Sequence, residues 1–584
     1  MTQNRSNRKI KRRNSIIVLL SLIGIITFTT VLFPQVRQLI LNYAIQILHK
    51  EPFSYKVSLR LLLSLAWGGI CFILFIDYCT FTNSGKALVQ EVKQEIKCCL
   101  SEIDHKVFIK PVLLMFGIYL LGILTIIRAN YLYIDDILWS ITGYREWGNW
   151  SRYMVVFLSY FVQPEIRMTD ISPIPQLLAI LILSCSSVLL VFIFGKGKIS
   201  TVGLLASIPL GLFPYFIECL SFKFMAPYLA LSILVSIIPF LFIKYKKAFF
   251  FCSTVSLLIL CMTYQVASGI YPMIALLLCF QDWNNRKKTN KEILSFLGIA
   301  ATAFCFSMLL FRLFFMKSVE SDDYYTSTEM LSISHLVPGI ISNIKNYVII
   351  IYNDLGIIWK IGIVLVLFFF VFKSIYNSAQ RRILSFFVVL AVIVLSFILS
   401  YGIYILLIRP LFVPRALFGF GVFLAILCVC TVSDYKKTAT IAVLALNWCL
   451  FAFAFSYGNA LADQARYAEF RIGILLHDLN TINLDKDKNE MSIQLQNSID
   501  FAPTIKNIAK HYPIIERLVP TRLGETIRFF DSRYFLYHFN YNPNVKYVDK
   551  SVIDFVPMNL PLILDSYYHT IQSDGEHILI TLKH

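Results

Sequence analysis

Long apolar segments recur along most of this chain, and they limit what it can fold into. Of all residues, 57% are hydrophobic and only 15% are charged, whereas soluble domains carry about 25% charged residues. Apolar stretches approaching 20 residues indicate membrane-spanning helices. Thirteen such segments cover residues 16–34, 58–78, 109–128, 176–194, 199–215, 224–243, 248–264, 267–281, 293–315, 356–373, 383–407, 416–433 and 438–457. The sequence therefore predicts an all-α polytopic membrane protein with about 13 transmembrane helices.

Basic residues are concentrated in the short connections between these segments. The net charge of +18 alone would suit a nucleic-acid-binding protein, but clustering in alternate connections is what the positive-inside rule describes for cytoplasmic loops. With the basic N-terminus (1–15) inside, every predicted inside loop is basic, although the outer loop 35–57 also carries three basic residues. No small-residue cleavage site follows the first apolar segment, so we expect an uncleaved helix. We expect the lipid bilayer, and no nucleic acid, as a partner.

This alternation places several connections of interest on the outer side of the membrane. They are 129–175, 214–223, 316–355 and 408–415. In the first of them, aromatic and apolar residues recur at three- and four-residue intervals from Trp147 to Phe161. This spacing predicts an amphipathic helix, which either lies in the headgroup plane or packs on its own protein.

The chain changes composition after the last apolar segment. We divide it into a cytoplasmic N-terminus (1–15), a membrane module (16–457) and an extracytoplasmic C-terminal domain (458–584). Apolar residues at helical spacing predict a helix over 458–480. Strand-like runs follow at Met491–Leu495, Thr526–Phe530 and His577–Leu582, with turn residues such as Asn540–Pro543 between them. A small α/β domain is predicted.

The outer connections supply the charges that a reaction on a lipid-borne sugar would need. Asp135 and Asp136 precede a helix expected from about Ile137, so either could cap it while the other accepts a proton as general base. The positive end of that helix would keep them ionised. A phosphate leaving group departs as an anion, which cations stabilise. The further candidates are Asp170, Glu218, Arg145, Arg152, Lys223, Arg409 and Arg415, with Gln265 as an amide that could bind hydroxyl groups.

Several of these candidates have structural alternatives. Arg409 and Arg415 could extend from helix ends toward the membrane surface. Asp170 could cap the segment that Pro173 opens, and Gln265 could be a polar contact between helices. The sequence leaves these alternatives open.

No definite cofactor is indicated. Asp135, Asp136 and Asp170 could hold Mg²⁺ or Mn²⁺ through oxygen ligands. Most of the 13 cysteines lie within apolar segments, and none shows zinc-ligand spacing, so neither a disulfide framework nor a zinc site is expected. Residues 129–175 contain no histidine, which argues against a histidine-based site there.

Short motifs between residues 129 and 421 form an ordered set. They are Tyr-Ile-Asp-Asp-Ile (133–137), Ser-Ile-Thr-Gly-Tyr (140–144), Asp-Ile-Ser-Pro-Ile-Pro-Gln (170–176), Pro-Tyr-Phe-Ile-Glu (214–218), Ser-Phe-Lys-Phe (221–224), Tyr264-Gln265 and Pro414-Arg415. In order and spacing, this set resembles the bacterial type II glucosyltransferase family (Glucos_trans_II), membrane enzymes related to O-antigen serotype-converting glucosyltransferases.

The resemblance implies a GT-C-like helical bundle with its active site at the outer face of the bacterial inner membrane. It implies a polyprenyl-phosphate-linked donor, undecaprenyl-phosphate glucose, and a glycan acceptor such as O-antigen. An aspartate of the first large outer loop would be the base of an inverting displacement, so Asp136 or Asp135 takes that role, with Asp136 preferred. Arg415 becomes a candidate for the lipid phosphate, and Gln176 joins the substrate-binding candidates.

Two other functions compete with this hypothesis. A lipid-linked oligosaccharide flippase or polymerase-like protein would place charged residues inside its spans, whereas this chain places nearly all of them at span ends, with Arg312 and Lys360 as partial exceptions. An envelope sensor that uses the C-terminal domain would leave the outer charges unexplained. The glycosyltransferase hypothesis accounts for both features.

Overall fold

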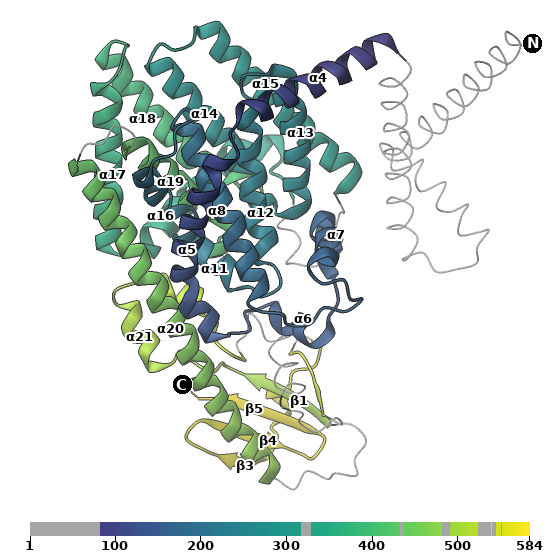
Figure 1. Ribbon diagram of the computed structural model, residues 1–584. Helices are drawn as coiled ribbons and strands as arrows, with labels where there is room; N and C mark the ends of the chain where they lie inside the picture. Colours follow the sequence, from purple (N-terminus) through teal and green to yellow (C-terminus); the bar gives the residue numbers. More distant parts are fainter. Residues whose placement is uncertain are drawn as a thin grey trace, which may run out of the picture.

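The computed structural model describes residues 82–316, 329–432, 437–481, 491–523, 539, 545–550 and 552–583. The basic N-terminus, the first two predicted spans, the predicted strand 526–530 and its neighbouring turn lie outside these residues. Within them, the chain forms a helical bundle with a small sheet at one end (Figure 1).

Eight helices in this part of the chain are long and apolar enough to cross a membrane. They are α5 (Lys106–Ala129), α8 (Ile174–Phe194), α13 (Lys246–Thr263), η3 with α14 (Gln265–Gly269 and Ile270–Asn284), α15 with the π-helical turn η4 (Asn290–Leu310 and Phe311–Phe315), α17 (Ile357–Tyr376), α18 (Arg382–Leu399) and α20 (Lys437–Thr481). Each overlaps a predicted span, so the prediction of a multi-pass membrane protein is confirmed.

The predicted span 199–215 is broken rather than straight. It consists of α9 (Thr201–Ala206) and α10 (Pro209–Leu212), which meet α11 (Pro214–Ser221) at a bend of 63°. Phe213 at the bend is extended, with ψ 140°, because a residue that precedes proline is disfavoured in the helical region. The bend turns α11 into the bundle, where all its residues are buried. The expectation of an outer loop over 214–223 was therefore wrong.

Two further predicted spans contain shorter helices than expected, and a third predicted span ends early. Span 224–243 is α12 (Ala226–Ile237) followed by the 3-10 turn η2 (Ile238–Phe242), at whose start Pro239 removes a backbone donor. Span 416–433 reduces to the turn η8 (Pro414–Ala416) and α19 (Gly419–Val432), which is buried along its whole length. Such a helix is apolar on every side because the bundle surrounds it. After α18, the predicted span 383–407 continues only as the 3-10 turn η7 (Gly402–Leu406).

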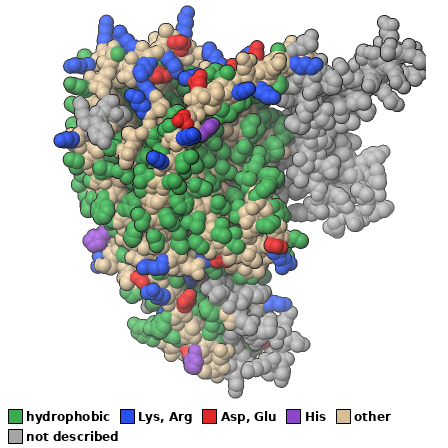
Figure 2. Space-filling view, viewed as in Figure 1, with side chains coloured by type: hydrophobic (Ala, Val, Ile, Leu, Met, Phe, Trp, Pro, Cys, Tyr) green, Lys and Arg blue, Asp and Glu red, His purple; other side chains and the backbone are tan. Residues whose placement is uncertain are grey.

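The predicted outer loop 316–355 also contains regular structure. The turn η6 (Ile333–His335) leads into α16 (Leu336–Asp354), which packs beside η7. Helix α4 (Asn83–Glu102) contacts α13 through the ion pair between Glu91 and Lys247. It also contacts the turn before α13, where Lys244 Nζ lies 2.8 Å from Glu102 Oε2. Hydrophobic side chains cover the middle of the molecule, and Lys and Arg gather at the α4 end (Figure 2).

A single helix joins the bundle to the sheet. The predicted span 438–457 and the predicted helix 458–480 are one continuous helix, α20, of 45 residues. Its early turns pack along α5, and its last turns place Ile472, Leu475 and Leu479 in a second core with the sheet.

The sheet has five strands in the order β2-β1-β5-β4-β3. Their bounds are β1 (Met491–Gln496), β2 (Val545–Tyr547), β3 (Leu562–Asp565), β4 (His569–Ser573) and β5 (His577–Leu582). β1 runs parallel to both β2 and β5, and the other pairs are antiparallel. The predictions for β1 and β5 are confirmed, whereas the other three strands were not predicted. The short helices α21 (Pro503–Ala509) and α22 (Ile515–Leu518) follow β1, and the turn η10 (Val556–Met558) precedes β3.

Candidate active site

The acidic pair lies where the chain turns after α5. Asn130, with φ 48°, ends α5 in the left-handed conformation, and Ile134, with φ 40°, turns the chain again before α6 (Asp136–Thr142). Asp135 occupies the N-cap position of α6, yet its side chain makes no capping hydrogen bond. The cap position of Asp135 is therefore confirmed, but its side chain does not act as an N-cap.

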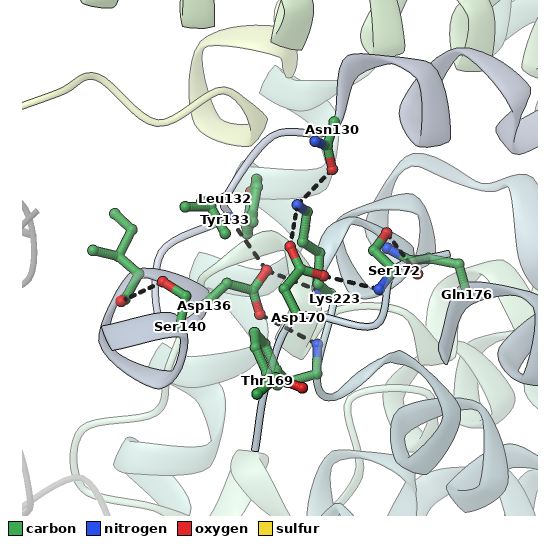
Figure 3. Close-up of polar contacts among 12 residues, drawn as sticks. Asn130, Leu132, Tyr133, Asp136, Ser140, Thr169, Asp170, Ser172, Gln176 and Lys223 are labelled. Atoms are coloured by element: carbon green, nitrogen blue, oxygen red, sulfur yellow. Dashed lines mark hydrogen bonds and ion pairs between the residues drawn. The ribbon is translucent and has the colours of Figure 1, made fainter. Parts of the chain in front are cut away.

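Asp136 is fully buried and binds backbone amides (Figure 3). Its Oδ2 accepts hydrogen bonds from the backbone N–H of Tyr133 at 3.2 Å and of Lys223 at 2.9 Å, and its Oδ1 accepts one from Phe224 at 3.4 Å. Burial raises the pKa of Asp136 to about 8, although these three N–H groups oppose the rise. Asp136 thus ties its own loop to the connection between α11 and α12.

Lys223 extends the same network with its side chain. Its Nζ donates to Asp170 Oδ2 at 2.7 Å and to Asn130 Oδ1 at 2.6 Å, and its side chain is only 4% exposed. Asp170 also accepts from the backbone N–H of Ser172 at 2.8 Å. We call Asn130, Asp136, Asp170 and Lys223 the lysine side of the site; these residues join three segments far apart in sequence.

Asp135 has a different environment from its neighbour. Its side chain is partly exposed and, within the described part of the chain, makes no hydrogen bond. Burial raises the pKa of Asp135, and the guanidinium groups of Arg415 and Arg152 partly offset that rise. Asp135 is therefore a carboxylate that two arginines attract but that no amide holds.

Arg415 is anchored by Glu218 of the buried helix α11. Its Nη1 lies 2.8 Å from Glu218 Oε1, and its backbone N–H donates to Glu218 Oε2. The Glu218 side chain is only 2% exposed, so this contact fixes the position of the arginine rather than leaving it to extend from a helix end. The sequence predicted both residues as site candidates, and the structure brings them together.

Arg152 lies over the ring of Tyr264, with its Cζ 4.9 Å from the ring centroid. Its Nε is buried and has no hydrogen-bond partner among the described residues. A buried donor without a partner costs free energy, and a ligand oxygen could satisfy it. Tyr264 also donates to the carbonyl of Arg415 at 3.5 Å. We call Asp135, Arg152, Arg415 and Tyr264 the arginine side.

Arg145 makes its contacts within its own loop. Its guanidinium donates to Ser159 Oγ at 2.9 Å and to the carbonyls of Ile166 at 2.7 Å and Gln163 at 2.6 Å. It also lies 4.1 Å from the ring centroid of Tyr160. These contacts hold the loop around α7 together and engage all three guanidinium nitrogens, so the prediction of Arg145 as a substrate-binding residue gains no support.

The predicted amphipathic helix over 147–161 is divided in two. A 3-10 turn, η1 (Glu146–Trp150), and α7 (Tyr153–Val162) meet at Ser151, whose φ of 60° interrupts the helix. Trp147 is buried against Trp139, their ring centroids 5.1 Å apart. Only the aromatic side chains Phe157, Tyr160 and Phe161 of α7 are exposed. Packing on the protein itself is therefore confirmed for Trp147, and a position of α7 in the headgroup plane stays a prediction.

The remaining candidates are spread around these two sides. Gln176 is buried on α8 and accepts from Ser172 Oγ at 3.3 Å, beside the lysine side. Gln265 is partly exposed and follows Tyr264 directly, whereas Arg409 is exposed in the 408–415 connection. In the part of the chain that the structure describes, no three His, Cys, Asp or Glu residues are grouped to hold a metal ion; Asp136 and Asp170 already have donors of their own.

Sequence reasoning missed the contributions of Tyr264 and Asn130. Tyr264 ends α13 beside Gln265, so its place at a span end was visible, but its contact with Arg152 was not. Asn130 gave no signal beyond its position after α5. Both contacts join residues roughly 90 or more positions apart, as in the pairing of Lys223 with Asn130 (93 positions), and no local pattern encodes them.

Comparisons with known proteins indicate the family of the chain. An uncharacterized 55.3 kDa protein in the gtrB 5′ region of Salmonella phage P22 is 24% identical over 455 residues, which cover 71% of this chain and 87% of that protein. No solved structure matches the chain. The family model described as glucosyl transferase GtrII matches residues 124–431, more than half of the chain, including both sides of the site. The chain belongs to the glucosyl transferase GtrII family.

Proposed function

We propose that this protein transfers glucose, or a similar hexose, from a polyprenyl-phosphate donor to a surface glycan such as O-antigen. Membership of a glucosyl transferase family supports glycosyl transfer, and the eight candidate spans support a lipid-borne substrate. A GT-C-like organisation of the bundle, with residues 458–584 as an extracytoplasmic domain, is part of this proposal.

The distribution of charge supports an outward-facing site. Lys and Arg gather at the α4 end of the molecule, whereas α6 and the sheet lie at the other end (Figures 1 and 2). Under the positive-inside rule the basic end is cytoplasmic. The site would then face the outer side of the inner membrane, where an O-antigen acceptor is exposed.

The observation that carries the proposal is the different pairing of the two aspartates. Asp136 uses both oxygens to hold three backbone amides. Asp135 has no such partner and lies under the influence of Arg415 and Arg152. A base must be able to reach a substrate proton, so Asp135 is the better candidate, although the sequence favoured Asp136. A raised pKa also makes Asp135 a stronger base once it is ionised.

In the proposed step, one bond forms and one breaks at the anomeric carbon. The acceptor hydroxyl gives its proton to Asp135 while its oxygen bonds to that carbon from the face opposite the phosphate. The carbon–oxygen bond to phosphate breaks, and its electron pair leaves with polyprenyl phosphate. Arg415 and Arg152 stabilise the charge that develops on the phosphate. The displacement inverts the anomeric configuration.

The test compares Asp135→Asn with Asp136→Asn in purified protein supplied with synthetic polyprenyl-phosphate glucose and an isolated O-antigen acceptor. We expect Asp135→Asn to lower kcat by about 10² to 10⁴ with an unchanged thermal midpoint, the range typical for loss of a general base. Asp136→Asn should lower the thermal midpoint because it disturbs amide contacts. Wild-type-like transfer by Asp135→Asn would overturn the assignment of the base.

The flippase alternative gains no support. The two charges that sequence analysis singled out within spans, Lys360 and Arg312, lie in the first turn of α17 and in the terminal π-helical turn after α15. Lys360 stacks on the ring of Tyr352, with its Nζ 3.6 Å from the ring centroid. Both charges are therefore near span ends rather than in a central cavity.

A further inference from the structure

The middle of the segment after β1 packs on the membrane bundle, while its two ends stay with the sheet. Residues 499–523, which include α21 and α22, lie beyond the family match at 124–431. Most of their buried side chains belong to the core of the bundle: Ala502, Ile505, Ile514, Ile515, Leu518 and Val519. Ile499 and Leu523, at the two ends of the segment, belong to the core beneath the sheet. We call residues 499–523 the strap, because they lie across the end of the bundle that carries the candidate site.

The strap binds the loop that carries the acidic pair. Tyr133 donates its hydroxyl hydrogen to the carbonyl of Leu518 at 2.7 Å, and Tyr131 donates to the carbonyl of Pro520 at 3.1 Å. In return, Arg522 donates to the carbonyl of Leu132 at 2.8 Å. Three successive residues of the loop, the last of them two positions before Asp135, are thereby held by the strap.

The strap also binds the connection that carries Arg415. The guanidinium of Arg517 donates to Asp354 Oδ2 and to the carbonyl of Phe412. Asp354 is buried at the end of α16 and accepts a second hydrogen bond from the hydroxyl of Tyr215 at 2.9 Å. Arg517 is therefore itself held in place, and it holds a carbonyl three residues before Arg415.

Through these contacts, the strap joins the loop that carries Asp135 to the connection that carries Arg415. The backbone N–H of Tyr133 binds Asp136, which begins α6 and so sets the position of Asp135. Phe412 lies in the same connection as Arg415, which Glu218 holds from the other side. The acidic loop and the 408–415 connection are separated by more than 270 residues, yet the strap contacts both.

We propose that the strap is a positioning element that sets the separation of Asp135 and Arg415, with Arg517 and Tyr133 as its positioning residues. This inference rests on the proposed function. Because a displacement of about 1 Å can cost about 100-fold in rate, a segment outside the family-matched region would then control donor binding and transfer. The C-terminal part of the chain becomes necessary for the reaction without touching the substrate.

The experiment uses the full-length protein, polyprenyl-phosphate glucose and the O-antigen acceptor. Arg517→Gln frees the carbonyl of Phe412, so we expect the KM for the donor to rise about 10-fold with little change in kcat, and Arg517→Lys to restore part of the loss. Tyr133→Phe keeps the ring but removes its hydroxyl, so we expect kcat to fall about 5-fold. Lys506→Ala is the matched control, because Lys506 lies on the strap but its side chain is exposed and pairs with Asp500, away from the acidic loop and the 408–415 connection.

A shift of KM in Arg517→Gln or of kcat in Tyr133→Phe, absent from Lys506→Ala, supports the inference. Wild-type constants in both variants, or losses that merely follow the amount of folded protein, overturn it. If Arg517→Gln fails to fold, Tyr133→Phe decides alone. Failure of the proposed function looks different, because the wild-type protein itself would then transfer no sugar.

Discussion

The lysine side and the arginine side of the site contain similar groups but pair them differently. On the lysine side, Lys223 is only 4% exposed, and the carboxylates of Asp136 and Asp170 all have donors within the protein. On the arginine side, Asp135 makes no hydrogen bond in the described part of the chain, and the Nε of Arg152 is buried without a partner there. Both sides include residues from the turn that leads from α5 into α6, namely Asn130 and Asp136 on the lysine side and Asp135 on the arginine side.

This difference indicates which groups maintain the fold and which are available to a substrate. A buried charge whose hydrogen bonds are all made within the protein stabilises one backbone arrangement. A buried donor without a partner costs free energy that a bound ligand can recover. Variants of the arginine side should therefore change catalysis and donor binding, whereas variants of the lysine side should change stability.

The largest of the expected effects is that of pH on kcat/KM. The proposed base, Asp135, can accept a proton only when it is ionised, so kcat/KM should fall about 10-fold per pH unit below its pKa. Burial places that pKa above the ordinary value. Arg152→Gln removes a charge that lowers the pKa of Asp135, so the acid limb of the pH profile should move to higher pH. An acid limb centred near pH 8, the pKa of Asp136, and absent from Asp136→Asn would transfer the role of base to Asp136.

The next effect separates the two arginines of the same loop. Arg152→Gln removes a cation that we place at the phosphate, and we expect the KM for polyprenyl-phosphate glucose to rise about 10-fold. Arg145→Gln removes three hydrogen bonds within the loop, so we expect a lower thermal midpoint but a KM near that of wild type. Steady-state kinetics and thermal unfolding in detergent measure both. Equal KM values for the two variants would contradict the proposed difference between Arg152, which binds the phosphate, and Arg145, which holds the loop.

The smallest effect on catalysis should come from the lysine side. Lys223→Met leaves Asp170 and Asn130 without their shared donor, and we expect the protein to lose about 2 kcal/mol of stability, as for a hydrogen bond to a charged group. The KM of the remaining folded protein should stay within about 3-fold of wild type. Denaturation of the purified variant measures the first quantity and donor titration the second. A KM raised as strongly as in Arg152→Gln would make Lys223 a substrate-binding residue.

Much of the site could be predicted as a set of residues but not as an arrangement. Asp135, Arg152, Glu218 and Arg415 are charges next to apolar segments, and that property is visible in a linear sequence. Their pairing was not visible, since Glu218 and Arg415 are 197 positions apart. The bend at Pro214, which turns Glu218 into the bundle, required knowledge of what surrounds α11.

The sequence by itself determined the class of protein, the position of most spans and the supply of charges at the candidate site. Hydrophobic segments and basic loops act through the bilayer, which each segment meets on its own, so their effect can be predicted locally. Only the tertiary structure decided how the contacts of Asp135 and Asp136 differ. These neighbours are chemically identical, and what distinguishes them is the set of donors that Lys223 and Phe224 bring to one and that Arg152 and Arg415 bring near the other.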